Sequence, residues 1–163
     1  MRVDGIDPDR LGGTMSKSRK KRESRHEAFV LDCSVALAWC FPDEKADYPQ
    51  SVLEALIGTP AIVPGLWPLE VANCLLVGER RKRCTQSDTT TWLSFLRSLP
   101  ISIDPETSNR AFSDGMNLAR SHRLSAYDGA YLELALRLGA PLATLDDKLR
   151  SAMTAVGISL FKP

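Results

Sequence analysis

Four acidic residues stand where they could form a single site. Asp32 and Asp146 each follow a short apolar run that is typical of a buried strand. Glu70 and Asp128 fall in the first turns of two predicted helices. In a parallel α/β sheet, the carboxyl ends of the strands and the starts of the following helices lie at one edge. We therefore expect these four carboxylates to converge.

A cluster of four carboxylates restricts the chemistry that it can support. Two like charges about 4 Å apart repel by roughly 4 kcal/mol at an effective dielectric constant of 20, so the cluster needs cations or raised pKa values. Oxygen ligands without thiolate or imidazole suit Mg²⁺ or Mn²⁺. One or two such ions lower the pKa of a bound water and orient it in line with a phosphodiester. Metal-assisted attack of water on a phosphodiester is therefore a chemistry open to this set.

Each acid also has a purely structural interpretation. Ser125 and Asp128 fit a capping box, and Asp146 could cap the helix that follows it. Glu70 is favourably placed against a helix dipole. Taken singly, such an Asp is a cap more often than a catalytic group, at roughly three to one. Only the four acids together favour a site.

The sequence disfavours several other kinds of site. His26 lies in a segment that is not expected to pack, which argues against catalysis by paired imidazoles. Asp32 is followed by Cys33 and Ser34 rather than by the D-x-D pattern of haloacid-dehalogenase-type phosphatases, and neither a P-loop nor a G-x-G-x-x-G pattern is present. A zinc site is also disfavoured, because no C-x-x-C spacing occurs, and reduced thiols are expected. The cysteines are Cys33, Cys40, Cys74 and Cys84.

Strands and helices are predicted to alternate along the chain. Short apolar runs predict strands at 28–31, 60–63, 101–103, 141–145 and 158–161. Helical spacing and turn residues predict helices at 35–41, 51–57, 68–83, around 92–99, 105–122, 125–138 and 147–156. This order predicts an α/β fold of three layers, with a central parallel sheet of four to five strands and helices on both faces.

Apolar stripes at helical spacing mark the helix faces that are expected to pack against the sheet. On the helix at 125–138, the stripe consists of Tyr127, Ala130, Tyr131, Leu134 and Leu138. On the helices at 68–83 and 105–122, the stripes consist of Leu69, Ala72 and Leu76, and of Phe112, Met116 and Ala119.

The composition indicates one ordinary globular domain preceded by a basic arm. The 163 residues, 44% of them hydrophobic and 25% charged, suffice to bury a core. Residues 1–28 carry a net charge of +3 and few apolar side chains, so we expect a disordered arm, part of it a tag or misassigned start. Because the whole chain carries +1, the domain at 29–163 carries −2. With no run near the roughly 20 apolar residues of a membrane span and no secretory segment, we expect a cytoplasmic protein without membrane contact.

Four segments stand in a recognisable order and spacing: FVLDCSVALAWCF, LEVANCLL, SAYDGAYLELA and PLATLDDKL. Together they resemble the PIN-domain ribonucleases, most closely the VapC-type toxins of bacterial toxin–antitoxin pairs. The resemblance covers about residues 29–163, which would form the PIN domain. It implies an endoribonuclease dependent on Mg²⁺ or Mn²⁺, built on a parallel α/β sheet. The catalytic and metal-binding acids that it implies are Asp32, Glu70, Asp128 and Asp146.

The resemblance also implies roles for neighbouring residues. Ser34 matches a small polar residue that would hydrogen-bond a water or the first Asp, although it could instead be a helix N-cap. Asn73 matches an Asn that would orient the Glu one turn before it. Asp147 is an alternative to Asp146 as the fourth acid, and we favour Asp146 because it is closer to the strand end.

The partners implied by the resemblance are an RNA substrate, a second copy of the chain and an antitoxin. A tRNA anticodon loop or an exposed rRNA loop is a plausible target, because single-stranded loops present accessible phosphates. The VapB-like antitoxin would cover the acidic groove of a homodimer. A basic run could contact RNA phosphates or, equally, complement a helix dipole; it consists of Arg80, Arg81, Lys82 and Arg83. The alternatives are a non-catalytic PIN-like module that binds RNA or protein, and a housekeeping RNA-processing nuclease without an antitoxin.

Overall fold

Four short parallel strands form the central sheet of the protein. The computed structural model describes residues 28–41 and 46–163, so the predicted arm lies, apart from Ala28, outside the described residues. The sheet order is β3-β2-β1-β4. The strands are β1 (Phe29–Leu31), β2 (Ala61–Val63), β3 (Ile101–Ile103) and β4 (Leu142–Ala143). All strand pairs are parallel, so their carboxyl ends lie at one edge of the sheet.

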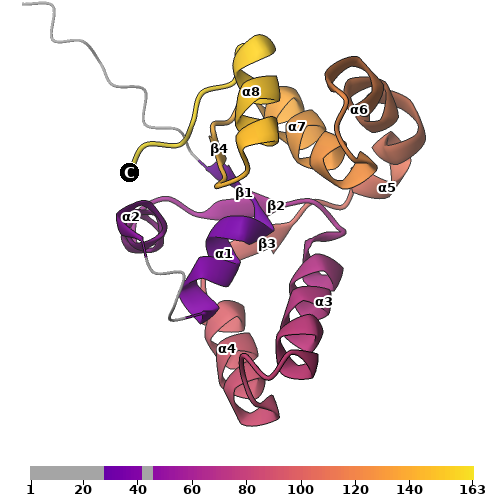
Figure 1. The fold of residues 1–163 in the computed structure, drawn as a ribbon. Coiled ribbons are helices and arrows are strands. Elements are labelled where there is room, and N and C mark those ends of the chain that lie inside the picture. Colours follow the sequence, from indigo (N-terminus) through magenta and orange to yellow (C-terminus); the bar gives the residue numbers. More distant parts are fainter. Residues whose placement is uncertain (1–27, 42–45) are drawn as a thin grey trace, which may run out of the picture.

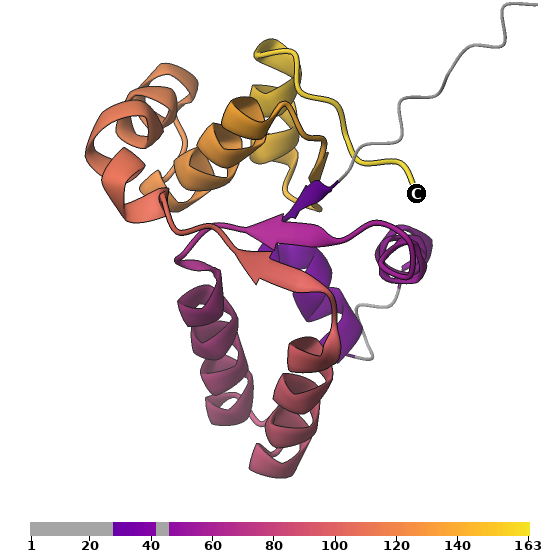
Figure 2. The same ribbon diagram turned by 180° about the vertical axis from the view of Figure 1, so that it is seen from behind.

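Helices cover both faces of this sheet, as the alternation of elements predicted. Figures 1 and 2 show α1, α3 and α4 on one side and α6, α7 and α8 on the other. The helices are α1 (Cys33–Cys40), α2 (Asp47–Ala55), α3 (Trp67–Arg80), α4 (Gln86–Ser98), α5 (Thr107–Arg110), α6 (Met116–His122), α7 (Ala126–Leu138) and α8 (Asp147–Ala155). A π-helical segment, η2 (Ala111–Gly115), joins α5 to α6. The predicted α/β fold of three layers is therefore confirmed.

Helix α7 lies at the centre of the layer formed by α6, α7 and α8, and the middle of the helix is buried on nearly every side. It packs on β1 and is also contacted by α6, η2 and α8. Tyr131 and Leu134 are therefore fully buried, as predicted. Tyr127 and Leu138, at the two ends of the predicted stripe, are instead 61% and 45% exposed. The prediction is wrong at both ends, where the covering elements no longer enclose the helix.

A close helix contact beside α7 depends on glycine. A Cβ atom on Gly129 would lie 2.6 Å from the carbonyl oxygen of Gly115 and 3.0 Å from the Cβ of Ala119. The missing side chain therefore allows η2 and α6 to pack directly on the first turns of α7. The π turn also inserts an extra residue and changes the helical phase. The predicted stripe on residues 105–122 consequently fails at Phe112, which is 89% exposed.

Helix α3 buries a different face from the predicted one. Leu69 and Leu76 are 75% and 53% exposed. The buried positions are Trp67, Val71, Leu75 and Gly78, which recur at helical spacing on the side that faces α1. Both faces of α3 carry apolar residues, so periodicity alone could not choose between them.

The predicted fifth strand, 158–161, is reduced to an isolated bridge between Leu142 and Leu160. The backbone N–H of Leu142 donates to the carbonyl of Ser159, and that of Phe161 donates to the carbonyl of Leu142. Phe161 then stacks on Phe29, with ring centroids 3.9 Å apart. The chain end thus closes the β4 side of the sheet.

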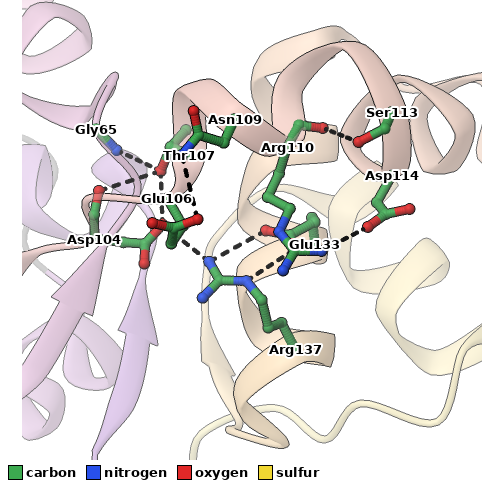
Figure 3. Close-up of polar contacts among 10 residues, drawn as sticks. All are labelled: Gly65, Asp104, Glu106, Thr107, Asn109, Arg110, Ser113, Asp114, Glu133 and Arg137. Atoms are coloured by element: carbon green, nitrogen blue, oxygen red, sulfur yellow. Dashed lines mark hydrogen bonds and ion pairs between the residues drawn. The ribbon is translucent and has the colours of Figure 1, made fainter.

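A buried ion network fastens α7 to the end of β3 (Figure 3). Arg137 on α7 donates to Asp104 at 2.9 Å and to Glu133 at 2.9 Å. Asp104 also accepts a hydrogen bond from Thr107 at 3.0 Å. Because both acids are buried, removing Arg137 would leave uncompensated charge at a cost of about 3–5 kcal/mol. This network holds α7 in place at the edge where the strands end.

The cysteines are in the reduced state that the sequence predicted. All four cysteines are free thiols. Within residues 28–41 and 46–163, no helix combines the length and apolar character that crossing a bilayer requires.

Candidate active site

Asp32 lies at the carboxyl end of β1 and is almost completely buried, with 5% of its surface exposed. Its Oδ2 atom accepts hydrogen bonds from the hydroxyls of Ser34 at 2.5 Å and Thr144 at 2.7 Å. Both hydroxyls are themselves held by backbone N–H groups, of Leu145 to Ser34 and of Asp146 to Thr144, each at 3.0 Å. The carboxylate orientation is therefore determined by a connected network.

The surroundings of Asp32 disfavour its charged form. Burial raises the pKa of the Asp32 carboxyl above its ordinary value, and the negative charge of Asp128 adds to this effect. The hydrogen bonds from Ser34 and Thr144 oppose the shift without cancelling it. Among the described residues, no Lys or Arg side chain forms an ion pair with Asp32. The buried Asp32 carboxylate is therefore held by hydrogen bonds but is paired with no cation of the described residues.

Glu70 approaches the same site from the first turn of α3. The hydroxyl of Tyr131, on α7, donates a short hydrogen bond to Oε2 of Glu70. Burial raises the pKa of the half-buried Glu70 carboxyl, the Tyr131 bond lowers it, and the charges of Asp32 and Asp128 raise it further. Glu70 thus lies within electrostatic range of both Asp residues.

Asp146 is the N-cap of α8, as its structural interpretation predicted, whereas Asp128 stands three residues after Ser125, the N-cap of α7, and forms only part of the predicted capping box. The hydroxyl of Ser125 accepts from the backbone N–H of Asp128 at 3.0 Å and donates to its Oδ2 at 2.7 Å. Oδ1 of Asp146 accepts from the backbone N–H of Leu149 at 2.7 Å, which caps α8. Each Asp nevertheless connects to Asp32, Asp128 through its charge and Asp146 through the hydroxyl of Thr144.

The four carboxylates share one pattern of hydrogen bonding. Each uses one oxygen for a bond to a hydroxyl or to a backbone N–H group. The other oxygen accepts no hydrogen bond from a side chain of the described residues. These second oxygens are Oδ1 of Asp32, Oε1 of Glu70, Oδ1 of Asp128 and Oδ2 of Asp146. At least one oxygen of each acid is thus held by the protein, and the Asp32 carboxyl also accepts a hydrogen bond from the backbone N–H of Cys33.

The donor chemistry of these acids fits a hard divalent cation. Carboxylate oxygens are the ligands that Mg²⁺ and Mn²⁺ prefer, and a cation would offset the buried charge of Asp32. Within the described part of the chain, however, no three acidic, histidine or cysteine side chains already stand close enough to form a ligand set. Asp128 is directed toward Ser125 and Asp146 toward the start of α8. Binding an ion would therefore require these side chains to turn inward.

The supporting residues from the sequence differ in how they are placed. Ser34 makes the hydrogen bond to Asp32 that the resemblance implied, and it lies inside α1 rather than at its N-cap. Asn73 is exposed and makes no hydrogen bond to Glu70, which Tyr131 holds instead. Asp147 is the exposed first residue of α8.

The predicted basic run lies away from the acids, at the turn between α3 and α4. Arg80 follows Glu70 by ten residues, which is about 15 Å along a helix axis. Arg83 is not simply exposed to solvent, since its guanidinium carbon lies 4.4 Å from the ring centroid of Phe41. The structure therefore separates this run from the acidic residues.

Sequence reasoning missed three residues that line this site. Thr144 is fully buried and bonded to Asp32, and its signal was a hydroxyl in the apolar run before Asp146. Tyr131 was assigned to the core without a role for its hydroxyl, which no spacing indicates. Cys33 is the third, and burial with the charges of Asp32 and Glu70 raises the pKa of its thiol well above the ordinary range. The thiol is therefore protonated at neutral pH.

Three comparisons with known proteins each found a match to this chain. The PIN domain family model matches residues 29–153. Ribonuclease VapC3 of Pyrobaculum aerophilum is 26% identical over 127 residues, which cover 78% of this chain and 95% of that protein. The crystal structure of PAE2754 from Pyrobaculum aerophilum is similar, with a TM-score of 0.56 and 21% identity, over 77% of this chain and 84% of that chain. Because the two chains are only 21% identical in sequence, the similarity of their structures supports the fold alone.

Proposed function

Because the chain belongs to the PIN domain family, we propose that it is a metal-dependent endoribonuclease and the toxin of a VapBC-type toxin–antitoxin pair. The observation that carries this proposal is the buried Asp32 carboxylate, held by two hydroxyls but paired with no cation of the described residues. An isolated buried charge is costly unless a ligand compensates it. The name of the similar Ribonuclease VapC3 supports the same activity.

The proposed cofactor is Mg²⁺ or Mn²⁺, held by carboxylate oxygens of the four acids once Asp128 and Asp146 have turned inward. When bound, such an ion lowers the pKa of a coordinated water and stabilises charge at the scissile phosphate and leaving oxygen. We assign its ligands to Asp32, Glu70, Asp128 and Asp146, which we also regard as the catalytic residues. Asp146 is preferred to Asp147 because its backbone N–H is tied to Thr144 and hence to Asp32.

The chain's own groups hold these ligands in position. Ser34 and Thr144 both bind Oδ2 of Asp32 and so fix the orientation of this carboxylate. Tyr131 does the same for Glu70 by occupying Oε2. The products expected are a 5′-phosphate and a 3′-hydroxyl end. Asn73 could act only after a rearrangement that brings it to Glu70.

The proposed partners follow from the family and from one surface feature. RNA is the substrate, with a tRNA as a candidate target, and the reaction would take place in the cytoplasm. A VapB-like antitoxin and a second copy of the chain are the proposed protein partners. Leu69 and Leu76 on the outer side of α3 support protein contact, since exposed apolar side chains on one helix face commonly mark interfaces.

Cleavage of total cellular RNA tests this proposal. The purified chain, freed of any copurified antitoxin, is incubated with Mg²⁺ or Mn²⁺ and with EDTA as a control. We expect discrete metal-dependent products that disappear in Asp128→Ala. Asp88→Ala is the matched control, because Asp88 stands at the same position of α4, three residues after the N-cap Thr85, and is not one of the four proposed ligands. Full cleavage of RNA by Asp128→Ala would contradict the proposal. An absence of cleavage by the wild type would favour a non-catalytic binding module.

A further inference from the structure

Arg150, a residue of α8, reaches back to the end of β4. Its Nε and Nη2 atoms donate to the carbonyl oxygen of Thr144 at 3.1 and 2.9 Å. Thr144 is fully buried, and among the described residues no backbone N–H group donates to this carbonyl. A buried carbonyl without a donor is costly. The guanidinium therefore supplies a hydrogen bond that the sheet itself does not provide.

Arg150 differs in this respect from the arginines that bind acids. Arg110 and Arg137 donate to neighbouring carboxylates. Within the described residues, Arg150 forms no ion pair with an acid, and its guanidinium carbon lies 5.8 Å from the ring centroid of Tyr48 on α2. The positive charge of Arg150 is thus directed at the main chain rather than at a carboxylate.

The peptide between Thr144 and Leu145 connects this guanidinium to Asp32. Its N–H group donates to the hydroxyl of Ser34 at 3.0 Å, and that hydroxyl donates to Oδ2 of Asp32 at 2.5 Å. The carbonyl and the N–H of a trans peptide point to opposite sides, so Arg150 and Ser34 hold this peptide from both. Because hydrogen bonds in a chain polarise one another, the charge of Arg150 strengthens the donation to Asp32.

The side chain of Thr144 extends the same connection to a second acid. Its hydroxyl donates to Oδ2 of Asp32 at 2.7 Å and accepts from the backbone N–H of Asp146 at 3.0 Å. Arg150 lies one helical turn after Asp146, and its own backbone N–H donates to the carbonyl of Asp146 at 2.9 Å. Because Arg150 fixes the main chain of Thr144, it also limits the positions that this hydroxyl can take.

We propose that Arg150 is a positioning residue of the acidic site, which holds Asp32 and Asp146 through the main chain of Thr144. This inference rests on the proposed ribonuclease function, and Arg150 acts in it without touching RNA or the ion. Arginine suits the role because its planar guanidinium places two N–H groups on one oxygen, whereas lysine offers a compact charge on a flexible stem.

Amide hydrogen exchange of the full chain in EDTA tests this role without metal or RNA. The wild type is compared with Arg150→Met, which removes the guanidinium, and with Arg150→Lys, which keeps the charge but not the paired donation. In Arg150→Met, the N–H groups of Leu145 and Asp146 should exchange on the order of tenfold faster, relative to those of β2. Arg150→Lys should give an intermediate increase. An equal increase in β2 would indicate a general loss of stability and would overturn the proposal.

Mn²⁺ binding in the absence of RNA provides a second measurement, by electron paramagnetic resonance of the unbound ion. The dissociation constant should rise by roughly 10–100-fold in Arg150→Met, the usual effect of removing a group that orients a metal ligand. Tyr48→Phe is the matched control, because the Tyr48 hydroxyl also donates to a backbone carbonyl, that of Phe161 at 3.0 Å, while its ring remains beside Arg150. Equal losses of Mn²⁺ affinity in the two variants would overturn the proposal.

Cleavage kinetics separate this role from a contact to RNA and from a failure of the ribonuclease proposal. At subsaturating Mn²⁺, Arg150→Met should lower kcat and leave the KM for RNA nearly unchanged. A raised KM with unchanged Mn²⁺ affinity would make Arg150 an RNA contact and overturn its positioning role. If the wild type binds Mn²⁺ more tightly than Arg150→Met but cleaves no RNA, the ribonuclease proposal fails and the positioning role stands. A wild type that binds no Mn²⁺ would overturn both.

Discussion

The two pairs of acids in the candidate site are positioned by different means. The inner pair, Asp32 and Glu70, is held by hydroxyls of residues 112 and 61 positions away in the chain, and Asp32 also by the nearby hydroxyl of Ser34. The outer pair, Asp128 and Asp146, is held by capping bonds to residues three positions away. Burial raises the pKa values of the inner pair above their ordinary values.

The two pairs therefore have opposite effects on the stability of the folded chain. The inner carboxylates are charged groups in a desolvated place, so they oppose folding until a cation binds. The outer carboxylates, by contrast, stabilise the starts of α7 and α8 when no cation is bound. Substitutions in the two pairs should therefore change stability in opposite directions while both reduce activity.

The largest effect is expected from Asp32→Asn. Metal-dependent cleavage should fall by more than the roughly 10–100-fold that is lost when a ligand's hydrogen-bonding partner is removed. In EDTA the same variant should melt at a higher temperature than the wild type, because an uncompensated buried charge is gone. Differential scanning calorimetry beside an RNA cleavage assay measures both. A lower melting temperature in EDTA would contradict the assignment of Asp32 as a destabilising charge.

A smaller loss is expected from Thr144→Val, which keeps the shape of the side chain but removes its hydroxyl. Asp32 then loses one of its two anchors, and the N–H of Asp146 loses its acceptor. Cleavage and Mn²⁺ affinity should each fall by roughly 10–100-fold. Thr90→Val is the control, because the Thr90 hydroxyl is exposed and bonds only to the carbonyl of Gln86. Equal behaviour of the two variants would remove Thr144 from the site.

The outer pair is tested by Asp146→Ala in the absence of metal. Loss of the cap on α8 should reduce the free energy of unfolding by about 1 kcal/mol, the usual cost of removing an Asp cap. Chemical denaturation in EDTA measures this change, with Asp147→Ala as the neighbouring control. Stabilisation by Asp146→Ala would mean that this acid behaves like the inner pair, and the contrast between the pairs would be lost.

The smallest expected effect is a change with pH in the stability that Asp32→Asn gains over the wild type. The folded-state pKa of Asp32 lies above its ordinary value of 3.8, so between the two values the folded chain binds more protons than the unfolded chain. The contribution of Asp32 to the stability of the wild type therefore becomes more favourable as the pH falls through that range. The advantage of Asp32→Asn in EDTA should be largest at neutral pH and should shrink toward pH 3.8. A gap that widens on acidification would contradict the raised pKa.

Local features of the structure were predictable to the extent that local interactions decide them. The strand at Ile101–Ile103 and the caps at Ser125 and Asp146 occur as predicted. Predictions of which helix face is buried were less reliable, because they depend on the elements that pack against each helix. Leu69 faces solvent because α1 packs on the other side of α3, and Phe112 does so because a π turn alters the phase of its helix.

The sequence by itself determined the alternation of strands and helices, the caps, and the four acids that stand at one edge of a parallel sheet. These features depend on neighbours within a few positions and on the general geometry of α/β folds. Only the tertiary structure decided that Thr144 and Tyr131 anchor Asp32 and Glu70. Such contacts join distant segments, and the free energy of a buried charge depends on all the groups that surround it in the folded chain.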